Sequence, residues 1–238
     1  MEGNPIMAEG GVLTGPEIRK EIYSGGIVVD PFNEDQVNPA SYDLTLGPKL
    51  AVYARSVYLG GGTKRVLGVP TSEQHKHTQN HRGSNICAVL EVIDSKRAAD
   101  MEVHEFTMGE DGWVLRPNVG YLMHTAERVT TKRFVPVIDG KSSIGRLFVA
   151  VHVTAGYGDP GFDGQYTLEV VVTHPVIVYP GMRIAQMRFH TMVGEFLDYQ
   201  QRGHYTGQAS MGPVPSKAYS QFEDDSARWS IGAKHAIE

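Results

Sequence analysis

Four side chains that can bind phosphate lie within one short segment. Lys141, Ser142, Ser143 and Arg146 supply two cations and two hydroxyls, which is the density of donors that a polyphosphate requires. They follow the β-branched run 134–138 and an Asp-Gly turn, so we expect a short helical turn whose free backbone amides face an anion. The alternative is an ordinary serine cap followed by an arginine that faces solvent.

Two carboxylates further along the chain have the chemistry to move protons. Glu169 is flanked by Leu168 and Val170 in a run of mostly apolar, strand-like residues. If it faces inward, burial raises its pKa and suits it to accept and return a proton near neutral pH. If it faces outward, it is an ordinary surface residue of a strand. Asp159 is either a second such group or a turn former beside Pro160.

The segment between the donors and Glu169 has the spacing Gly-x-Gly-x-x-Gly, at Gly156, Gly158 and Gly161. The dinucleotide-binding fingerprint of that form needs a helix directly after it, whereas the run 166–172 predicts a strand. We therefore expect a hairpin-like connection, in which glycine lets the backbone approach a small ligand. An ordinary glycine-rich β-turn is the alternative.

Composition limits the classes of partner. The formal net charge of -5 argues against a non-specific nucleic-acid binder, and no apolar run approaches the roughly 20 residues of a membrane-spanning helix. Cys87 is the only cysteine and the amino terminus lacks the pattern of a secretion signal, so a cytoplasmic protein without disulfides is expected. The histidines His75, His77 and His81 form a weak metal pattern, and solvent-exposed polar residues are the preferred interpretation.

The elements that must position these residues are mostly strands. The 27 glycines and 13 prolines separate short β-branched segments, as is typical of a barrel or sandwich. A short helix is expected from Thr14 to the Gly25-Gly26 pair, with Ile18, Ile22 and Tyr23 on one face. Strands are expected at 27–29, 42–46, 86–93, 113–115, 121–123, 134–138, 147–153, 166–172, 176–179 and 184–189.

The domain organisation predicted from length and composition is simple. A flexible leader at 1–12 precedes a single domain at 13–198, which has an elaboration at about 56–112. Residues 199–238 are polar and rich in Gly, Gln and Pro, which predicts either a disordered tail or a flap that orders over a ligand.

Taken together, these segments resemble the dCTP deaminase family within the trimeric dUTPase superfamily. Lys-Ser-Ser-x-x-Arg, Thr-Ala-x-x-x-Asp-Pro-Gly and Leu-Glu occur in the family's order. Further matches are at 13–18, 41–47, 115–117, 180–184, 207–208 and 212–216. The resemblance implies a mainly β fold, a distorted dUTPase-like jelly-roll barrel with a few short helices, assembled as a homotrimer with active sites between subunits.

The resemblance also implies the ligands. The substrates are dCTP and dUTP, Mg²⁺ binds with the triphosphate, no catalytic zinc is used, and dTTP is an expected feedback inhibitor. A single cysteine could not supply the Pro-Cys-x-x-Cys pair of the zinc nucleobase deaminases. No nucleic-acid or membrane partner is expected.

The family's functional residues transfer to matching positions. Glu169 would activate the attacking water and shuttle protons, Ser142 and Arg146 would organise water, base and phosphates, and Asp159 would orient a water for attack on the α-phosphate. The other substrate-binding positions implied are Lys141, Ser143, Thr154, Ala155, Gly156, Phe162, Tyr205 and Gln208. The departures from the family pattern are Lys141 in place of a frequent arginine, the segment 56–112, which has no clear counterpart in the family, His204 in place of a common lysine, and the additional residues Ser210 and Met211.

Gly156 favours the bifunctional branch of that family, which converts dCTP and two waters to dUMP, ammonia and pyrophosphate. The alternatives within the superfamily are a deaminase that releases dUTP and a dUTPase without deaminase activity, against which Glu169 argues. A non-catalytic nucleotide-sensing barrel would have no need of Ser142, Arg146, Asp159 and Glu169 together. A sugar- or protein-binding β-sandwich would explain the strands but not the phosphate donors.

Overall fold

The computed structural model describes residues 10–53, 56–58, 65–66, 87–89, 93–96, 103–195, 197–203, 205 and 212–220. Several sequence predictions fall outside these residues. They concern most of the leader, the histidines His75, His77 and His81, the tail residues His204, Gln208, Ser210 and Met211, and the end of the tail from 221.

The chain forms two compact units. The first comprises residues 1–50 and 107–213, and the second comprises residues 51–106 and 214–238. Every residue of the expected phosphate-binding, glycine-rich and carboxylate segments belongs to the first unit. The predicted division into leader, domain and tail stays a prediction.

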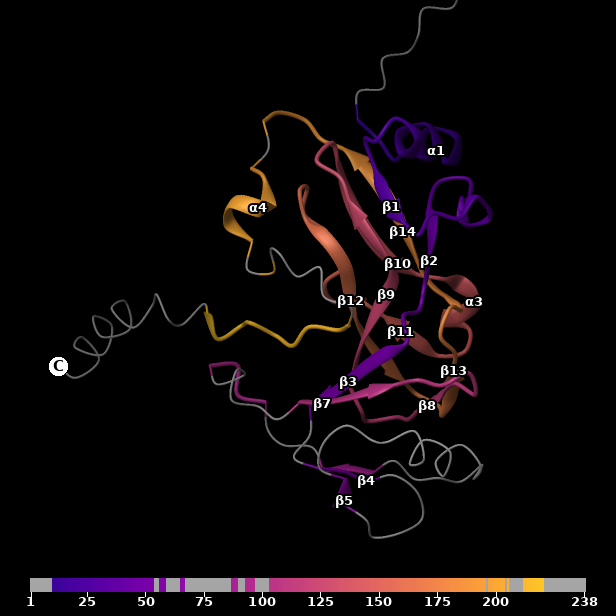
Figure 1. The fold of residues 1–238 in the computed structure, drawn as a ribbon, viewed down its shortest axis with the longest axis vertical. Helices are drawn as coiled ribbons and strands as arrows, with labels where there is room; N and C mark the ends of the chain where they lie inside the picture. The colour runs from indigo at the N-terminus through magenta and orange to yellow at the C-terminus, as the bar shows by residue number, and fades with distance from the viewer. Residues whose placement is uncertain are drawn as a thin grey trace, which may run out of the picture. The chain divides into compact units, whose positions relative to one another are not determined.

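The fold is mainly β, as predicted (Figure 1). The helices are short: α1 (Gly15–Tyr23), the 3-10 turn η1 (Glu34–Gln36), α3 (Ser142–Gly145) and α4 (Tyr199–Arg202). The strands of the first unit are β1 (Val28–Asp30), β2 (Tyr42–Thr45), β8 (Trp113–Leu115), β9 (Tyr121–Thr130), β10 (Phe134–Gly140), β11 (Val149–Val151), β12 (Asp163–Val172), β13 (Val176–Val178) and β14 (Arg183–Thr191). The chain enters the second unit within β3 (Lys49–Tyr53), and β4 (Ser56–Tyr58), β5 (Arg65–Val66), β6 (Cys87–Val89) and β7 (Val103–Thr107) follow.

Two antiparallel sheets position the expected site. In one, β10 and β2 lie on either side of β14, and the three strands run side by side in Figure 1. In the other, β12 lies between β11 and β9, and β1 pairs with the far end of β9. Among the described residues neither of these sheets closes on itself, so closure into a barrel stays a prediction.

Alternating burial along the strands builds the core of the first unit. On β12, Leu168 and Val170 are fully buried whereas Glu169 between them is half-buried, because successive side chains of a strand point to opposite faces. Packing also explains the glycine at position 47, which ends the family match at 41–47. A Cβ on Gly47 would lie 2.0 Å from the ring of buried His124, so only glycine fits there.

Helix α1 begins where the sequence predicts, with Thr14 at the N-cap and proline in the first turn. Thr14 makes no side-chain capping hydrogen bond. Ile18 is fully buried and Ile22 partly so, but the prediction that Tyr23 shares their face is wrong, because Tyr23 is exposed and its hydroxyl donates to Glu34 at 2.6 Å. In the ranges that the structure covers, no helix is both long and apolar enough to cross a membrane.

Candidate active site

The predicted helical turn of the phosphate donors is confirmed as α3, which directly follows β10. Buried Ile144 fixes the turn to the core, while Ser142, Ser143 and Arg146 are exposed. Within the described ranges, none of these three side chains makes a hydrogen bond or ion pair with another residue. The two hydroxyls and the guanidinium therefore remain available to a ligand.

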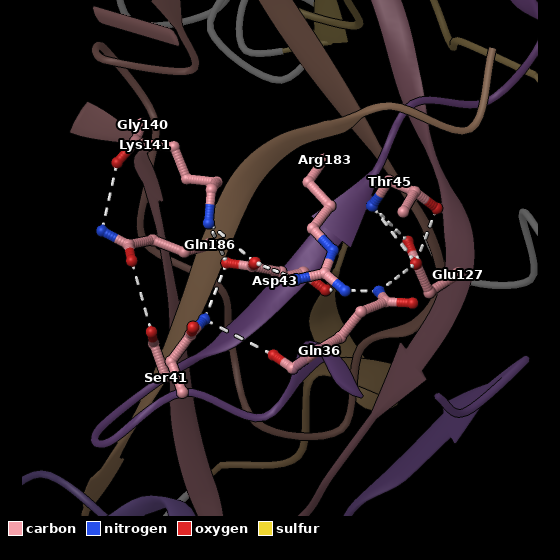
Figure 2. Close-up of polar contacts among 10 residues, drawn as sticks. Gln36, Ser41, Asp43, Thr45, Glu127, Gly140, Lys141, Arg183 and Gln186 are labelled. Atoms are coloured by element: carbon pink, nitrogen blue, oxygen red, sulfur yellow. Dashed lines mark hydrogen bonds and ion pairs between the residues drawn. The ribbon is translucent and has the colours of Figure 1, made fainter. Parts of the chain in front are cut away.

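Lys141, the N-cap residue of α3, is different. Its ammonium donates to both carboxylate oxygens of Asp43 on β2, each at 2.7 Å (Figure 2). The lysine side chain is 21% exposed and that of Asp43 is completely buried. The structure thus ties the start of the turn to β2, a contact between residues 98 positions apart.

The glycine-rich loop is a hairpin-like connection from β11 to β12, as predicted, and it lies along the edge of β10. The amide of Ile138 donates to the Gly156 carbonyl at 2.7 Å, and the amide of Gly158 donates to the Pro136 carbonyl at 2.8 Å. A Cβ on Gly156 would lie 2.5 Å from the Ile138 carbonyl oxygen. Close backbone contact therefore requires glycine at position 156. Thr154 and Ala155, before it, are exposed.

Glu169 forms a pair that the sequence analysis missed. Oε2 of Glu169 lies 2.6 Å from Nδ1 of His152, the residue that directly follows β11. The register of β11 and β12 pairs Val151 with Val170, and the His152 amide donates to the Glu169 carbonyl at 2.8 Å. Antiparallel pairing thus brings the two side chains together. In the described part of the chain no side chain hydrogen-bonds Oε1, the other carboxylate oxygen.

The expectation that Glu169 has a raised pKa is wrong. Partial burial is the largest influence and favours the neutral carboxyl, but the hydrogen bond and charge of His152, together with a backbone hydrogen bond, outweigh it. The net result is a pKa of Glu169 below its ordinary value. The carboxylate is therefore ionised near neutral pH and ready to accept a proton.

His152 has an unusual conformation. It is buried, and its φ of 52° lies in the left-handed region that non-glycine residues rarely adopt. Such residues are held in place by their surroundings and concentrate at functional sites. No sequence signal reveals that φ, although a histidine near the end of the predicted strand 147–153 and next to the Thr154-Ala-Gly segment was available as a hint.

An aromatic cluster lies at the other end of the loop. The Phe162 ring packs against Tyr166, with centroids 4.7 Å apart, and against Tyr199 of α4, at 5.7 Å. The hydroxyl of Tyr199 accepts a hydrogen bond from the Tyr205 amide at 3.2 Å. The predicted residues Phe162 and Tyr205 are thus connected through Tyr199, which the sequence analysis did not identify.

Asp159 is exposed beside this cluster. Burial raises the pKa of the Tyr166 hydroxyl well above its ordinary value, and the charge of Asp159 adds to the effect. The start of α4 is held against the loop, since the Tyr199 amide donates to the Pro160 carbonyl at 3.0 Å and Asp198 accepts from the Gln200 amide and from Lys132. Asp159 therefore lies close to Tyr166 and Tyr199 but remains open to solvent.

The structure brings the predicted residues together only in groups. One group is the turn at 141–146, a second is the pair Glu169 and His152, and a third is Asp159 with the aromatic cluster. The edge of β10 and strand β11 connect the groups. In the described part of this single chain, Glu169 makes no hydrogen bond or ion pair with Ser142 or Arg146. No group of three or more His, Cys, Asp or Glu side chains forms a metal-binding arrangement among the residues searched.

Comparison with known proteins identifies the family. A family model described as dCTP deaminase-like matches residues 12–192. This chain belongs to the dCTP deaminase-like family. It is 36% identical over 212 residues to the dUMP-forming dCTP deaminase of Leptospira biflexa serovar Patoc (strain Patoc 1 / Ames), an alignment that covers 89% of this chain and 98% of that protein.

Two further members of the dCTP deaminase-like family extend the comparison. The dUMP-forming dCTP deaminase of Clostridium beijerinckii is 34% identical over 212 residues, covering 89% of this chain and 99% of that protein. The solved 2'-deoxycytidine 5'-triphosphate deaminase from Agrobacterium tumefaciens aligns with a TM-score of 0.50 and 21% identity, covering 84% of this chain and 54% of that one. This chain therefore spans about half of the solved chain, a likeness that concerns the fold alone.

Proposed function

We propose that this protein deaminates dCTP and hydrolyses the resulting dUTP, giving dUMP, ammonia and pyrophosphate. The observation that supports this most strongly is the ionised, half-buried Glu169 held by His152, in a chain whose relatives over nearly their whole length are named dUMP-forming dCTP deaminases. The product places the enzyme in pyrimidine deoxynucleotide metabolism.

In the first reaction, Glu169 accepts a proton from water through the carboxylate oxygen that His152 leaves free. The hydroxide adds to C4 of cytosine, and Glu169 passes the water proton to N3 as the tetrahedral centre forms. The C4 hydroxyl then gives up its proton, which reaches the amino group, and cleavage of the C4–N bond releases ammonia and leaves the C4 carbonyl of the uracil ring. One carboxylate suffices as base and then acid, because the proton it takes is returned within the same turnover.

The phosphate chain would be held by Ser142, Ser143 and Arg146, whose donors are exposed and unengaged in the described ranges. Hydroxyls and a guanidinium donate hydrogen bonds to phosphate oxygens, whereas a guanidinium cannot be a ligand to a cation. Mg²⁺ would therefore bind mainly to the triphosphate and neutralise its charge there. Thr154, Ala155 and Gly156 would line the base. Gln208 stays a predicted contact outside the described residues.

In the second reaction, Asp159 would orient a water for attack on the α-phosphate, with pyrophosphate as the leaving group. The ring of Phe162, which packs against Tyr166 and Tyr199, would lie against the deoxyribose and exclude a 2'-hydroxyl. Tyr205 lies near that ring through Tyr199 and would approach the same nucleotide.

We also propose a homotrimer with the site between subunits. Several large apolar side chains around the site are exposed in the single chain, including Phe148 at 59%, Val153 at 77% and Tyr157 at 69%. Apolar surface of this kind beside a polar site is typical of a protein interface. A second copy of this chain would cover it and bring the separate groups of site residues together. Closure of the barrel, inhibition by dTTP and a cytoplasmic location remain predictions.

The test is incubation of the purified protein with dCTP and Mg²⁺, with separate assays for ammonia, pyrophosphate and dUMP. We expect the three products in equal amounts, and little reaction with CTP. Accumulation of dUTP without dUMP would eliminate the coupled hydrolysis. Release of pyrophosphate from dUTP without ammonia from dCTP would leave a dUTPase.

A further inference from the structure

A buried carboxylate lies beneath the turn that we assign to phosphate. Asp43 accepts hydrogen bonds from Lys141 on both oxygens, from Asn38 Nδ2 at 2.7 Å on Oδ1, and from Arg183 Nη1 at 3.4 Å on Oδ2 (Figure 2). Its backbone carbonyl accepts from Gln36 at 2.7 Å. A charge that is completely buried must be paired and hydrogen-bonded in this way to be tolerated.

Lys141 occupies the connection between β10 and α3. Its carbonyl accepts from the amides of Ile144 and Gly145, at 3.0 and 2.8 Å, which closes the helical turn. The preceding residue is held as well, because Gln186 donates to the Gly140 carbonyl at 3.1 Å and accepts from Ser41 at 3.2 Å (Figure 2). The position of the turn therefore depends on contacts with β2 and β14.

The ammonium of Lys141 is committed to this contact. An ammonium has three donors, and the two oxygens of Asp43 receive hydrogen bonds from it. A phosphate could reach only the third donor of Lys141 without displacing the buried carboxylate, whereas Ser142, Ser143 and Arg146 can bind without breaking any described contact. Of the two cations in the turn, Lys141 is therefore less suited than Arg146 to bind phosphate directly.

We propose that Asp43 is a positioning residue for the phosphate-binding turn, acting through Lys141, which serves as an anchor rather than as a phosphate ligand. The inference rests on the proposed function, because binding of the nucleotide gives the turn its role. A turn displaced by about 1 Å could lower kcat/KM roughly a hundredfold, so the anchor would matter without touching the substrate.

A double-mutant cycle separates the anchor from a direct contact. Asp43→Asn keeps the shape of the side chain and removes its charge, and Lys141→Met removes the ammonium. If the two act as one unit, each substitution raises the KM for dCTP about tenfold or more with a smaller change in kcat, and the double variant is no worse than either single variant. Such coupling is not expected of two residues with independent roles.

Glu21→Gln is the control for loss of an ionic contact made by a buried carboxylate. Glu21 is buried on α1 and accepts from Arg133 at 2.7 Å, away from the turn. Its substitution should lower the melting temperature and leave the KM for dCTP unchanged. An equal rise in KM in this control would show that general destabilisation explains the Asp43 effect and would overturn the proposal.

The opposite pattern of KM values in the Asp43 and Lys141 variants would also overturn the proposal. If Lys141→Met raises the KM while Asp43→Asn leaves it unchanged or lowers it, the lysine is a phosphate ligand that Asp43 restrains. If wild-type protein releases no ammonia from dCTP, the proposed function fails separately, and calorimetric titration of the same variants with inorganic tripolyphosphate tests the anchor. Coupled weakening of that binding would support the anchor, and independent effects or no binding by wild type would refute it.

Discussion

At the residue scale, the pair Glu169 and His152 determines how the site can work. The carboxylate lies on the less buried face of β12, and the histidine that follows β11 hydrogen-bonds it at 2.6 Å. A half-buried carboxylate would ordinarily have a raised pKa, but this partner reverses the direction. The proposed base could be named from the sequence, whereas its ionisation state depends on a neighbour placed by strand register.

The pH dependence of kcat/KM should report this partner. A base works only when deprotonated, so the rate is lost as pH falls through the pKa of Glu169, which lies below the ordinary value of 4.5 in the native enzyme. His152→Gly permits the positive φ but removes the ring, so only the backbone hydrogen bond still opposes the effect of burial, and the acid limb should move to higher pH. The pH profile of dCTP deamination measures this shift.

His152→Asn is the control for that experiment. Asparagine tolerates the left-handed backbone and can place an amide donor near the position of Nδ1, but it carries no charge. Its acid limb should fall between those of the native enzyme and the glycine variant. An identical acid limb in all three proteins would contradict the assignment of Glu169 as the base.

The contact between Lys141 and Asp43 could not be predicted from the sequence. Lys141 was predicted as a phosphate contact from its position beside two serines, whereas we propose that it anchors the turn through Asp43. Its partner Asp43 lies 98 residues earlier, and nothing local to either segment indicates the pair. The family match at 41–47 pointed to the importance of the segment but not to its contact.

At the element scale, most strands that border the site were predictable because β-branched runs alternate with glycine and proline. The strand at 113–115 was predicted with its exact bounds, and α3 begins at Ser142 as expected. Strands β3 and β7 were not identified. In β7 the buried positions include His104 beside Phe106, so the alternation of polarity is hidden although the alternation of burial is regular.

Substitution of Gly156 tests the close contact between β10 and the loop before β12. Gly156→Ala would place a Cβ 2.5 Å from the Ile138 carbonyl, so the loop must move away from β10. We expect a cost of about 1–3 kcal/mol, which corresponds to a fall in melting temperature of several degrees. Because Asp159 lies on the same loop, hydrolysis of dUTP should fall further than deamination of dCTP.

Gly120→Ala is the matched control, since a Cβ there would meet nothing within 4 Å. This substitution should leave the melting temperature and both activities close to those of the native protein. If Gly156→Ala behaves in the same way, the loop has room to adjust and close backbone contact is not the reason for the glycine.

At the scale of the whole molecule, the site is divided among groups of residues that a single chain does not bring into direct contact. We therefore expect sedimentation equilibrium to give three times the mass of the chain. Val153 is exposed in the single chain, and we expect a second copy to cover it in the trimer. Val153→Asp would place a charge in that interface, so this variant should dissociate and lose activity. Val193→Asp changes a side chain that is 92% exposed and should remain trimeric and active.

A fully active monomer would contradict the trimer proposal. The sequence could suggest a trimer only through family resemblance, because assembly depends on a surface that strand patterns do not define. The second unit is similarly hard to predict from the sequence, since its short strands are separated by long polar segments with no clear period.

We propose that Glu169 moves the protons of deamination while other residues perform hydrolysis. The most direct test compares Glu169→Gln with the native enzyme, measuring ammonia from dCTP and pyrophosphate from dUTP. We expect ammonia release to fall by about 10²–10⁴-fold and dUTP hydrolysis to fall far less. Ammonia release at the native rate by this variant would contradict the account.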